Sequence, residues 1–306
     1  MNKIAAIDLG TNTMRLLLCE VENGVFLKKN KEVVTTRIGK NLSKSGAMSK
    51  ESMKLNIEAL KSLKNEAQTY GAEEIITIAT SAVRDAVNKV DFLYDVKKET
   101  GLEIKVLSGN EEAIIGMLGV TYGLPENENI LIADVGGGST EIVLSRNKKI
   151  KFSQSIDAGA VRMTERFLMS DPIQDKDIKN LKENLLRLFS YSTDKLSNTE
   201  LNKVIAIGGT ASTAAAIFHG MELYNPGRIH NTILELSFLI GLFDKLKSMT
   251  VEERYQIKGL EKERADIIPA GIYILIFIIE ALGIKKIIVS DNDNLEGAII
   301  KYSGKL

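Results

Sequence analysis

Two stretches of the chain share one pattern: DLGTNTMRLLL at residues 8–18 and DVGGGSTEIVL at residues 134–144. In each, an acid and an apolar residue precede glycine, two small residues, a hydroxyl residue, two further residues and an apolar run. Because apolar residues also precede each acid, the pattern predicts a strand, a tight turn and a second strand. One unit used twice predicts two similar domains whose turns face a shared cleft, although short hairpins can also match by chance.

Strands and helices alternate between and after the two hairpins, which predicts an α/β fold with mixed sheets. The segment PENEN at 125–129 is the best candidate for a linker. We therefore expect a first domain over residues 1–123 and a second over 124–291. The segment 292–306 is expected to return to the first domain.

The composition excludes several classes of protein. Lys plus Arg and Asp plus Glu are 40 each, so no overall basic field favours nucleic acid, and no nucleic-acid partner is expected. The single cysteine excludes an internal disulfide and a cysteine-based zinc site, and it fits a reducing, cytoplasmic location. The charge at Asp8 interrupts the N-terminal apolar residues, so we expect no signal peptide. The apolar run from Ile267 to Ile279 is too short to span a bilayer, so no membrane partner is expected.

The glycine-rich turn of the second hairpin suits a phosphate. A backbone without Cβ atoms lets an anion approach successive N–H groups closely. The predicted phosphate-binding residues of this turn are Gly136, Gly137, Gly138 and Ser139. Phosphate often brings Mg²⁺, an ion that prefers oxygen ligands, and Asp134 and Glu141 flank the turn as candidate metal ligands. The alternative is an ordinary glycine-rich turn with incidental acids.

Two further turns combine glycine with hydroxyl or amide side chains. DLGTN at 8–12 contributes Asn12, and AIGGTAST at 206–213 contributes Gly209 where a helix is expected to begin. A helix N-terminus favours anions. Close packing of strand and helix is the structural alternative for the second of them.

The segment VLSGNEEAIIG at 106–116 predicts a strand followed by a helix with a capping box, Ser108 at the N-cap and Glu111 at the third position. Glu112 is not needed for the cap, so its carboxylate is a candidate general base that activates water. Two solvated glutamates beside the helix dipole are the alternative.

ITIATSAVRDA at 76–86 predicts a strand, caps at Thr80 and Ser81, and Arg84 in the first helical turn. An arginine is poorly placed there for the helix dipole. A phosphate clamp accounts for it, and an ion pair with Asp85 or a glutamate is the alternative.

Six motifs occur in an order that resembles the exopolyphosphatase/guanosine pentaphosphate phosphohydrolase family: AAIDLGTNTMRLL, TSAVRDA, LSGNEEA, DVGGGSTE, IGGTAST and ERADIIPAG. The resemblance implies the actin-like, sugar-kinase-like ATPase superfold, with two ribonuclease-H-like domains and a phosphate cleft between them. It also implies Glu112 as the general base and Asp134 and Glu141 at the metal. The phosphate-contacting positions that it implies are Asn12, Arg84, Gly137, Gly138, Ser139 and Gly209.

Three positions depart from the family pattern. Leu295 stands where an arginine is usual, Asn292 where a glycine is usual, and Asn231 where glycine usually follows histidine. The base and metal positions are intact, so hydrolysis is still expected.

The expected activity is Mg²⁺-dependent removal of the terminal phosphate of inorganic polyphosphate. Hydrolysis of guanosine pentaphosphate uses the same chemistry and stays open. A small-molecule kinase or a phosphate or nucleotide sensor of the same superfold is the more remote alternative. A homodimer is possible, but the sequence does not determine the oligomeric state.

Overall fold

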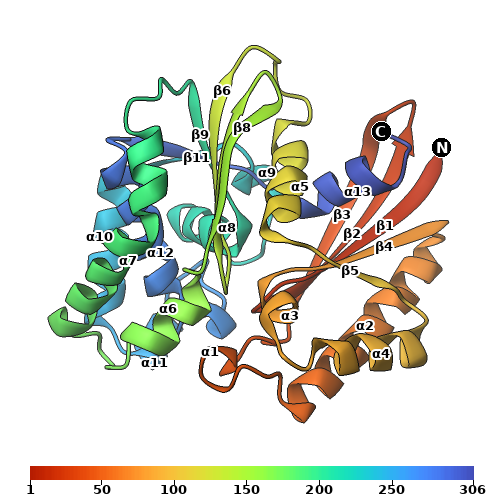
Figure 1. Cartoon of the computed structure of the whole chain (residues 1–306), viewed down its shortest axis with the longest axis horizontal. Helices are drawn as coiled ribbons and strands as arrows, with labels where there is room; N and C mark the ends of the chain where they lie inside the picture. The colour runs from red at the N-terminus through yellow and green to blue at the C-terminus, as the bar shows by residue number, and fades with distance from the viewer. The chain divides into compact units, whose positions relative to one another are not determined.

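The computed structural model describes residues 1–306, with the side chain of Ser43 excepted. The chain divides into two compact units (Figure 1). Unit 1 contains Met1–Tyr122 and Asp293–Leu306, and unit 2 contains Gly123–Asn292. Each unit has its own mixed sheet, as the α/β pattern predicts.

Unit 1 is built on a five-stranded sheet with the order β3-β2-β1-β4-β5. The first three strands are antiparallel neighbours, and β4 and β5 run parallel to β1. The strands are β1 (Asn2–Leu9), β2 (Thr13–Glu22), β3 (Val25–Thr35), β4 (Glu74–Ala79) and β5 (Ile104–Val106).

The two faces of this sheet bury different helices. Alternate side chains of β1 and β2 pack with α2 (Lys50–Tyr70) and α4 (Lys89–Thr100) on one face. The opposite face packs against α5 (Gly109–Thr121) and α13 (Asn294–Tyr302). The short helices α1 (Leu42–Ser45) and α3 (Ser81–Asp85) lie in the connections.

Unit 2 repeats this topology and adds one strand. Its six-stranded sheet has the order β10-β11-β9-β6-β7-β8. Strands β6, β7 and β8 are antiparallel neighbours, and β9 runs parallel to β6, as β4 does to β1. The strands are β6 (Asn129–Val135), β7 (Thr140–Arg146), β8 (Lys149–Ile156), β9 (Lys203–Ile207), β10 (Thr232–Glu235) and β11 (Lys286–Val289). The repeated order is that of a ribonuclease-H-like sheet, so the expected fold class is confirmed.

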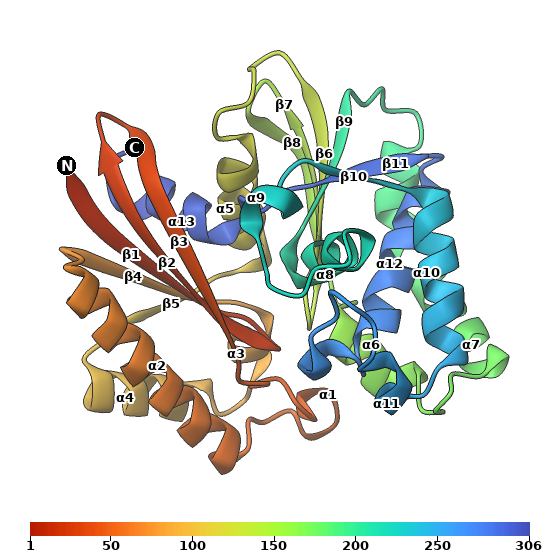
Figure 2. The same ribbon diagram turned by 180° about the vertical axis from the view of Figure 1, so that it is seen from behind.

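The apolar run near residue 270 forms α12 (Ile268–Ala281), which is buried along most of its length. It packs against α6, α7, α8 and α10 (Figure 2). The remaining helices of unit 2 are α6 (Ala160–Phe167), α7 (Asp175–Leu196), α8 (Gly208–Phe218), α9 (Pro226–Ile229), α10 (Leu236–Ser248), α11 (Val251–Arg254) and the 3₁₀ helix η1 (Lys262–Arg264). The prediction of a buried core helix is therefore confirmed.

Both predicted hairpins are present and their turns match. Gly10 N–H donates to the Thr13 carbonyl at 3.0 Å, and Gly136 N–H donates to the Ser139 carbonyl at 3.0 Å. The strand registers match too, since Asp8 lies opposite Arg15 and Asp134 lies opposite Glu141. The pattern shared by the two stretches is therefore one structural unit used twice.

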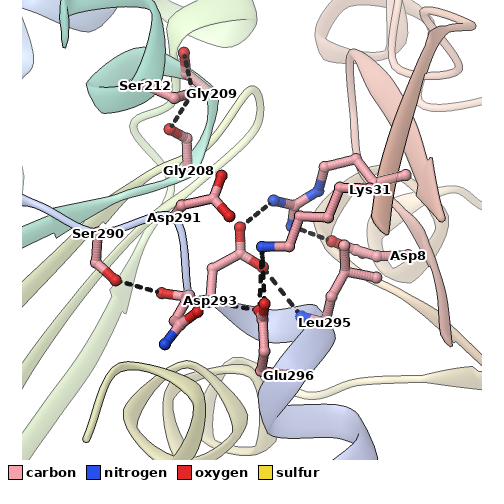
Figure 3. A network of polar contacts seen from close by, with 12 residues as sticks. Asp8, Lys31, Gly208, Gly209, Ser212, Ser290, Asp291, Asp293, Leu295 and Glu296 are labelled. Atoms are coloured by element: carbon pink, nitrogen blue, oxygen red, sulfur yellow. Dashed lines mark hydrogen bonds and ion pairs between the residues drawn. The ribbon is translucent and has the colours of Figure 1, made fainter. Parts of the chain in front are cut away.

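Helix α13 returns to unit 1 and is held there by buried ion pairs (Figure 3). Asp293 caps the helix and accepts a hydrogen bond from Arg15, which also donates to Asp8. Glu296 is fully buried and accepts hydrogen bonds from Lys29 and Lys31, each at 3.1 Å. Three cations of β2 and β3 thus fix the start of the helix.

The departures from the family pattern have structural explanations at two positions. Leu295 is fully buried in the apolar core between the sheet of unit 1 and α13, where a charged side chain would need a partner. Asn231 has a φ of 66°, in the left-handed region where glycine is the usual residue and asparagine is the best tolerated alternative. Nothing in the structure explains Asn292.

Helices α5 and α13 approach each other through two glycines. A Cβ on Gly119 would lie 1.9 Å from the Asp293 carbonyl oxygen, and a Cβ on Gly297 would lie 1.8 Å from the Ile115 carbonyl oxygen. Because both clashes are with backbone, a larger residue would push the helices apart.

We expect Gly119→Ala to lower the free energy of unfolding by about 1–3 kcal/mol, the usual cost of forcing extra atoms into a packed contact. Gly241→Ala in α10 is the matched control, since a Cβ there meets no described atom within 4 Å. Alanine in an open helical position should instead stabilise by roughly 0.5–1 kcal/mol. Urea midpoints of the two variants measure the difference, and equal midpoints would contradict the packing argument.

A carboxylate pair links β3 to α2. A hydrogen bond with Glu32, partial burial and the charge of Glu32 raise the pKa of Glu66 to about 7 from its ordinary value of 4.5. Between these two values the folded protein keeps a proton that the unfolded chain loses.

The contribution of Glu66 to stability should therefore be fully present below its ordinary pKa and should be lost as the pH rises through about 7. Glu66→Gln should remove this part of the pH dependence, because the amide does not ionise. Glu58→Gln is a control on the same helix, where the carboxylate pairs with Lys61 instead. Urea midpoints between about pH 5 and pH 8 test the prediction, and an unchanged pH slope in Glu66→Gln would refute it.

Candidate functional site

The turn Gly136–Ser139, called here the glycine turn, has its carbonyl groups fixed by α6. The Gly136 carbonyl accepts from Ala160 N–H at 2.9 Å, and the Gly137 carbonyl accepts from Val161 N–H at 2.9 Å. The Gly138 carbonyl accepts from the Arg162 side chain at 2.7 Å. In a trans peptide the C=O and N–H groups point in opposite directions. The N–H groups of Gly137, Gly138 and Ser139 therefore point away from α6, which is the arrangement that an anion-binding nest needs.

The glycine turn and the start of α6 are in backbone contact. A Cβ on Gly159 would lie 2.4 Å from the Gly137 carbonyl carbon and 2.5 Å from the Gly138 nitrogen. The Thr140 hydroxyl donates to the Ala158 carbonyl on the same segment. Gly159 is thus required by close approach, and the sequence pattern gave no sign of it.

Asp134 and Glu141, the predicted metal ligands, lie directly opposite each other on β6 and β7. Residues in this relation share one face of a sheet, with Cβ atoms about 4.5–5.5 Å apart. Both side chains are buried, and Glu141 Oε1 accepts a hydrogen bond from Ser155 Oγ at 2.7 Å. Two carboxylates at this spacing suit a hard cation such as Mg²⁺, which needs only one or two protein carboxylates beside water and phosphate oxygens.

The two glycines at the start of α8 lie beneath charged side chains. A Cβ on Gly208 would lie 2.3 Å from Asp134 Oδ1, and a Cβ on Gly209 would lie 2.2 Å from Arg264 Nη1. Gly208 also has a φ of 82°. The predicted phosphate residue Gly209 is therefore covered by a guanidinium. Gly208 and Arg264 were missed from sequence, because their role depends on contacts between distant segments.

Arg84 and Glu112 are paired in unit 1. Arg84 Nη1 donates to Glu112 Oε2 at 2.7 Å and to the Leu107 carbonyl at 3.1 Å. Glu112 is buried and Arg84 is partly buried, so the pair is not a fully solvated surface contact. The ion pair with a glutamate that the sequence analysis left as an alternative for Arg84 is present, and it joins two predicted site residues.

Helix α3 is only five residues long, so Arg84, its fourth residue, lies in the first helical turn as predicted. One local prediction about this segment is wrong. Thr80 occupies the N-cap position but its side chain makes no cap; the hydroxyl donates to the Leu9 carbonyl of β1 instead. The tertiary contact with the neighbouring strand replaces the local cap.

The sequence predicts different roles for the adjacent residues Glu111 and Glu112 of α5, and the predicted capping role of Glu111 is confirmed. Ser108 Oγ accepts from Glu111 N–H at 3.3 Å, and Glu111 Oε2 accepts from Ser108 N–H at 2.8 Å. This is a complete capping box. Its hydrogen bonds lower the pKa of Glu111, so this carboxylate is committed to the helix end.

The first hairpin contains, at or next to its turn, two buried polar atoms that have no hydrogen-bond partner among the described residues. They are Asn12 Nδ2, a donor, and Asp8 Oδ1, an acceptor. Burial raises the pKa of Asp8 even though Arg15 acts in the opposite direction. Asn12 was predicted as a phosphate contact, whereas Asp8 was missed, although the hairpin repeat aligns it with Asp134.

The predicted site residues fall into two groups. Unit 1 contains Asn12, Arg84 and Glu112, and unit 2 contains Asp134, the glycine turn, Glu141 and Gly209. Within the described residues, no three His, Cys, Asp or Glu side chains cluster as metal ligands. None of the described helices has the length and apolar character needed to cross a bilayer.

Several known proteins are similar to this chain. It is 34% identical over 316 residues to a bifunctional 3-dehydroquinate synthase/phosphatase of Fusobacterium nucleatum, a match that covers 97% of this chain but only 46% of that relative. It is 29% identical over 319 residues to Exopolyphosphatase 2 of Mycobacterium tuberculosis, covering 99% of both. A crystal structure of an exopolyphosphatase from Cytophaga hutchinsonii superposes with a TM-score of 0.88 at 27% identity, over 97% of this chain and 96% of that one.

The family model described as the Ppx/GppA phosphatase family matches residues 19–305, which is nearly the whole chain. This agrees with the motif order found in the sequence and with the duplicated sheet topology. The chain belongs to the Ppx/GppA phosphatase family and is a phosphohydrolase.

Proposed function

We propose that the protein is a Mg²⁺-dependent exopolyphosphatase that releases the terminal phosphate of inorganic polyphosphate. The observation that carries the proposal is that the two adjacent glutamates at the start of α5 have different contacts. Glu111 is used by the helix cap, whereas the adjacent Glu112 is buried and held by Arg84 at 2.7 Å. A buried carboxylate with no role in the helix end is the residue type that a water-activating site requires.

In the proposed reaction a water oxygen attacks the terminal phosphorus while Glu112 takes the proton of that water. The bond between the phosphorus and the bridging oxygen breaks, and the shortened chain leaves with that oxygen. Arg84 keeps the Glu112 carboxylate in place through its charge-assisted hydrogen bond.

The glycine turn is proposed to bind the non-bridging oxygens of the transferred phosphoryl group. Its N–H groups point away from α6, and such preorganised donors stabilise charge that grows in the transition state. Asp134 and Glu141 would hold Mg²⁺, and the bound ion would neutralise phosphate charge. The pair fits this role because two buried carboxylates on one sheet face offer hard oxygen ligands and leave coordination positions for water and phosphate.

The names of the relatives support polyphosphate as the substrate. The mycobacterial relative and the structure from Cytophaga hutchinsonii are both called exopolyphosphatases. The family description also contains GppA, so guanosine pentaphosphate stays as the second substrate to test.

The deciding experiment measures phosphate release from long-chain polyphosphate, guanosine pentaphosphate and ATP, each with Mg²⁺ and with a chelator. The proposal predicts Mg²⁺-dependent release that is fastest from polyphosphate. Faster release from guanosine pentaphosphate would shift the assignment to that substrate. Transfer to an added hydroxyl compound, or binding without turnover, would replace it with a kinase or a sensor.

Substitutions of the two adjacent glutamates should distinguish the general base, Glu112, from the capping residue, Glu111. Glu112→Gln keeps the size of the side chain but does not accept a proton, so kcat on polyphosphate should fall by roughly 10²–10⁴-fold. Glu111→Gln still forms a capping box and should change kcat and the urea midpoint only slightly. If Glu111→Gln were the inactive variant, the assignment of the base would be wrong.

Loss of either proposed metal ligand should show in the Mg²⁺ dependence. Asp134→Asn and Glu141→Gln keep the shape of the pair and reduce its negative charge, so half-maximal activity should require a higher Mg²⁺ concentration. Asp194→Asn, at an exposed position of α7 in the same unit, is the control and should leave the Mg²⁺ curve unchanged. Identical Mg²⁺ curves for all three variants would exclude this pair as the metal site.

A further inference from the structure

One peptide of the glycine turn differs from the others in how it is held. The Gly136 and Gly137 carbonyls are bonded by backbone N–H groups at the start of α6. The Gly138 carbonyl is bonded by a side chain, the Nε–H of Arg162, at 2.7 Å. The peptide between Gly138 and Ser139 therefore depends on the identity of a single residue.

The orientation of this peptide determines where the Ser139 N–H points. The peptide is planar, so fixing the carbonyl oxygen fixes the N–H on the opposite side. Glycine has more backbone freedom than any other residue, so a Gly138 without a bound carbonyl could rotate this N–H out of the nest. Ser139 itself is buried, which makes its N–H dependent on the protein or on a ligand for a partner.

Arg162 is well placed to act on the carbonyl. It lies in the first turn of α6, and its own backbone N–H donates to the Gly137 carbonyl at 3.1 Å. Its side chain is 15% exposed, and its Nη2 lies 3.7 Å from Asp157 Oδ1 on the segment that leads into α6. The backbone and side chain of one residue thus bond two successive carbonyls of the glycine turn.

We propose that Arg162 is a positioning residue for phosphoryl transfer, which orients the Ser139 N–H by holding the Gly138 carbonyl. This proposal rests on the proposed function, because it assumes that the glycine turn binds the transferred phosphoryl group. Arg162 acts from the side of the turn opposite to the N–H donors, so its contribution comes through the peptide and not through direct contact with phosphate.

A simple effect of positive charge is the competing explanation, and the chain offers variants that distinguish the two. Arg162→Lys keeps the charge but has no donor at the Nε position, and its amine lies at the end of a flexible stem. Arg162→Met removes both the charge and the donor. Arg166→Met removes the same charge from an exposed position of the same helix and is the matched control.

We expect both Arg162 variants to lower kcat on long-chain polyphosphate by about 10–100-fold, within the range that a misplaced catalytic group costs. KM should change less, because the N–H donor matters most as charge grows in the transition state. Arg166→Met should match the wild type. Urea midpoints are measured in parallel to show that each variant is folded at the assay temperature.

A second experiment tests separately whether the glycine turn binds phosphate and whether Arg162 orients Ser139. Inorganic phosphate is titrated into the protein, and the amide NMR signals of Gly137, Gly138 and Ser139 are followed. In the wild type all three signals should shift, and in Arg162→Lys the Ser139 shift should be lost. If the wild-type signals do not respond, the glycine turn is not the phosphate site and the proposed function fails. If they respond but Arg162→Lys shifts Ser139 and turns over like the wild type, the positioning role of Arg162 is wrong.

Discussion

The hydrogen bond from Gly136 N–H to the Ser139 carbonyl closes the turn between β6 and β7, and the geometry of the candidate site in unit 2 depends on this closure. It sets the register in which Asp134 lies opposite Glu141, because a shift of one residue would send one carboxylate to the other face of the sheet. It also leaves the three glycine peptides with their carbonyls toward α6 and their N–H groups on the other side.

Close approach by another segment explains five glycines of the chain, one of which, Gly208, also has a positive φ. Gly159 meets the glycine turn, Gly208 lies under the Asp134 carboxylate, and Gly209 lies under the Arg264 guanidinium. In unit 1, Gly119 and Gly297 let α5 and α13 touch through their backbones. At each of these positions a Cβ would occupy space that another segment already fills, so a substitution would move a neighbouring backbone or a charged group.

Adjacent residues of one helix can have separate roles because a helix turns about 100° per residue. Glu111 faces its own N-terminus and completes the capping box, whereas Glu112 faces Arg84 of the neighbouring helix. In α13 the two roles are combined instead, because Asp293 and Glu296 form a capping box and also bind cations of the sheet. The buried ion pairs of these two acids therefore also attach α13 to the sheet of unit 1.

The sequence by itself determined the two hairpins, the buried helix α12 and the Ser108–Glu111 cap, because these depend on local spacing and on the apolar pattern. It also identified the acids and glycines of the second turn as candidates, whereas Asp8 at the matching position of the first turn was missed. Only the tertiary structure decided that Arg84 pairs with Glu112, that Thr80 bonds β1 instead of capping α3, and that Arg162 holds Gly138. These contacts join residues far apart in the chain, and their partners are chosen by which strands and helices become neighbours once the sheets have formed.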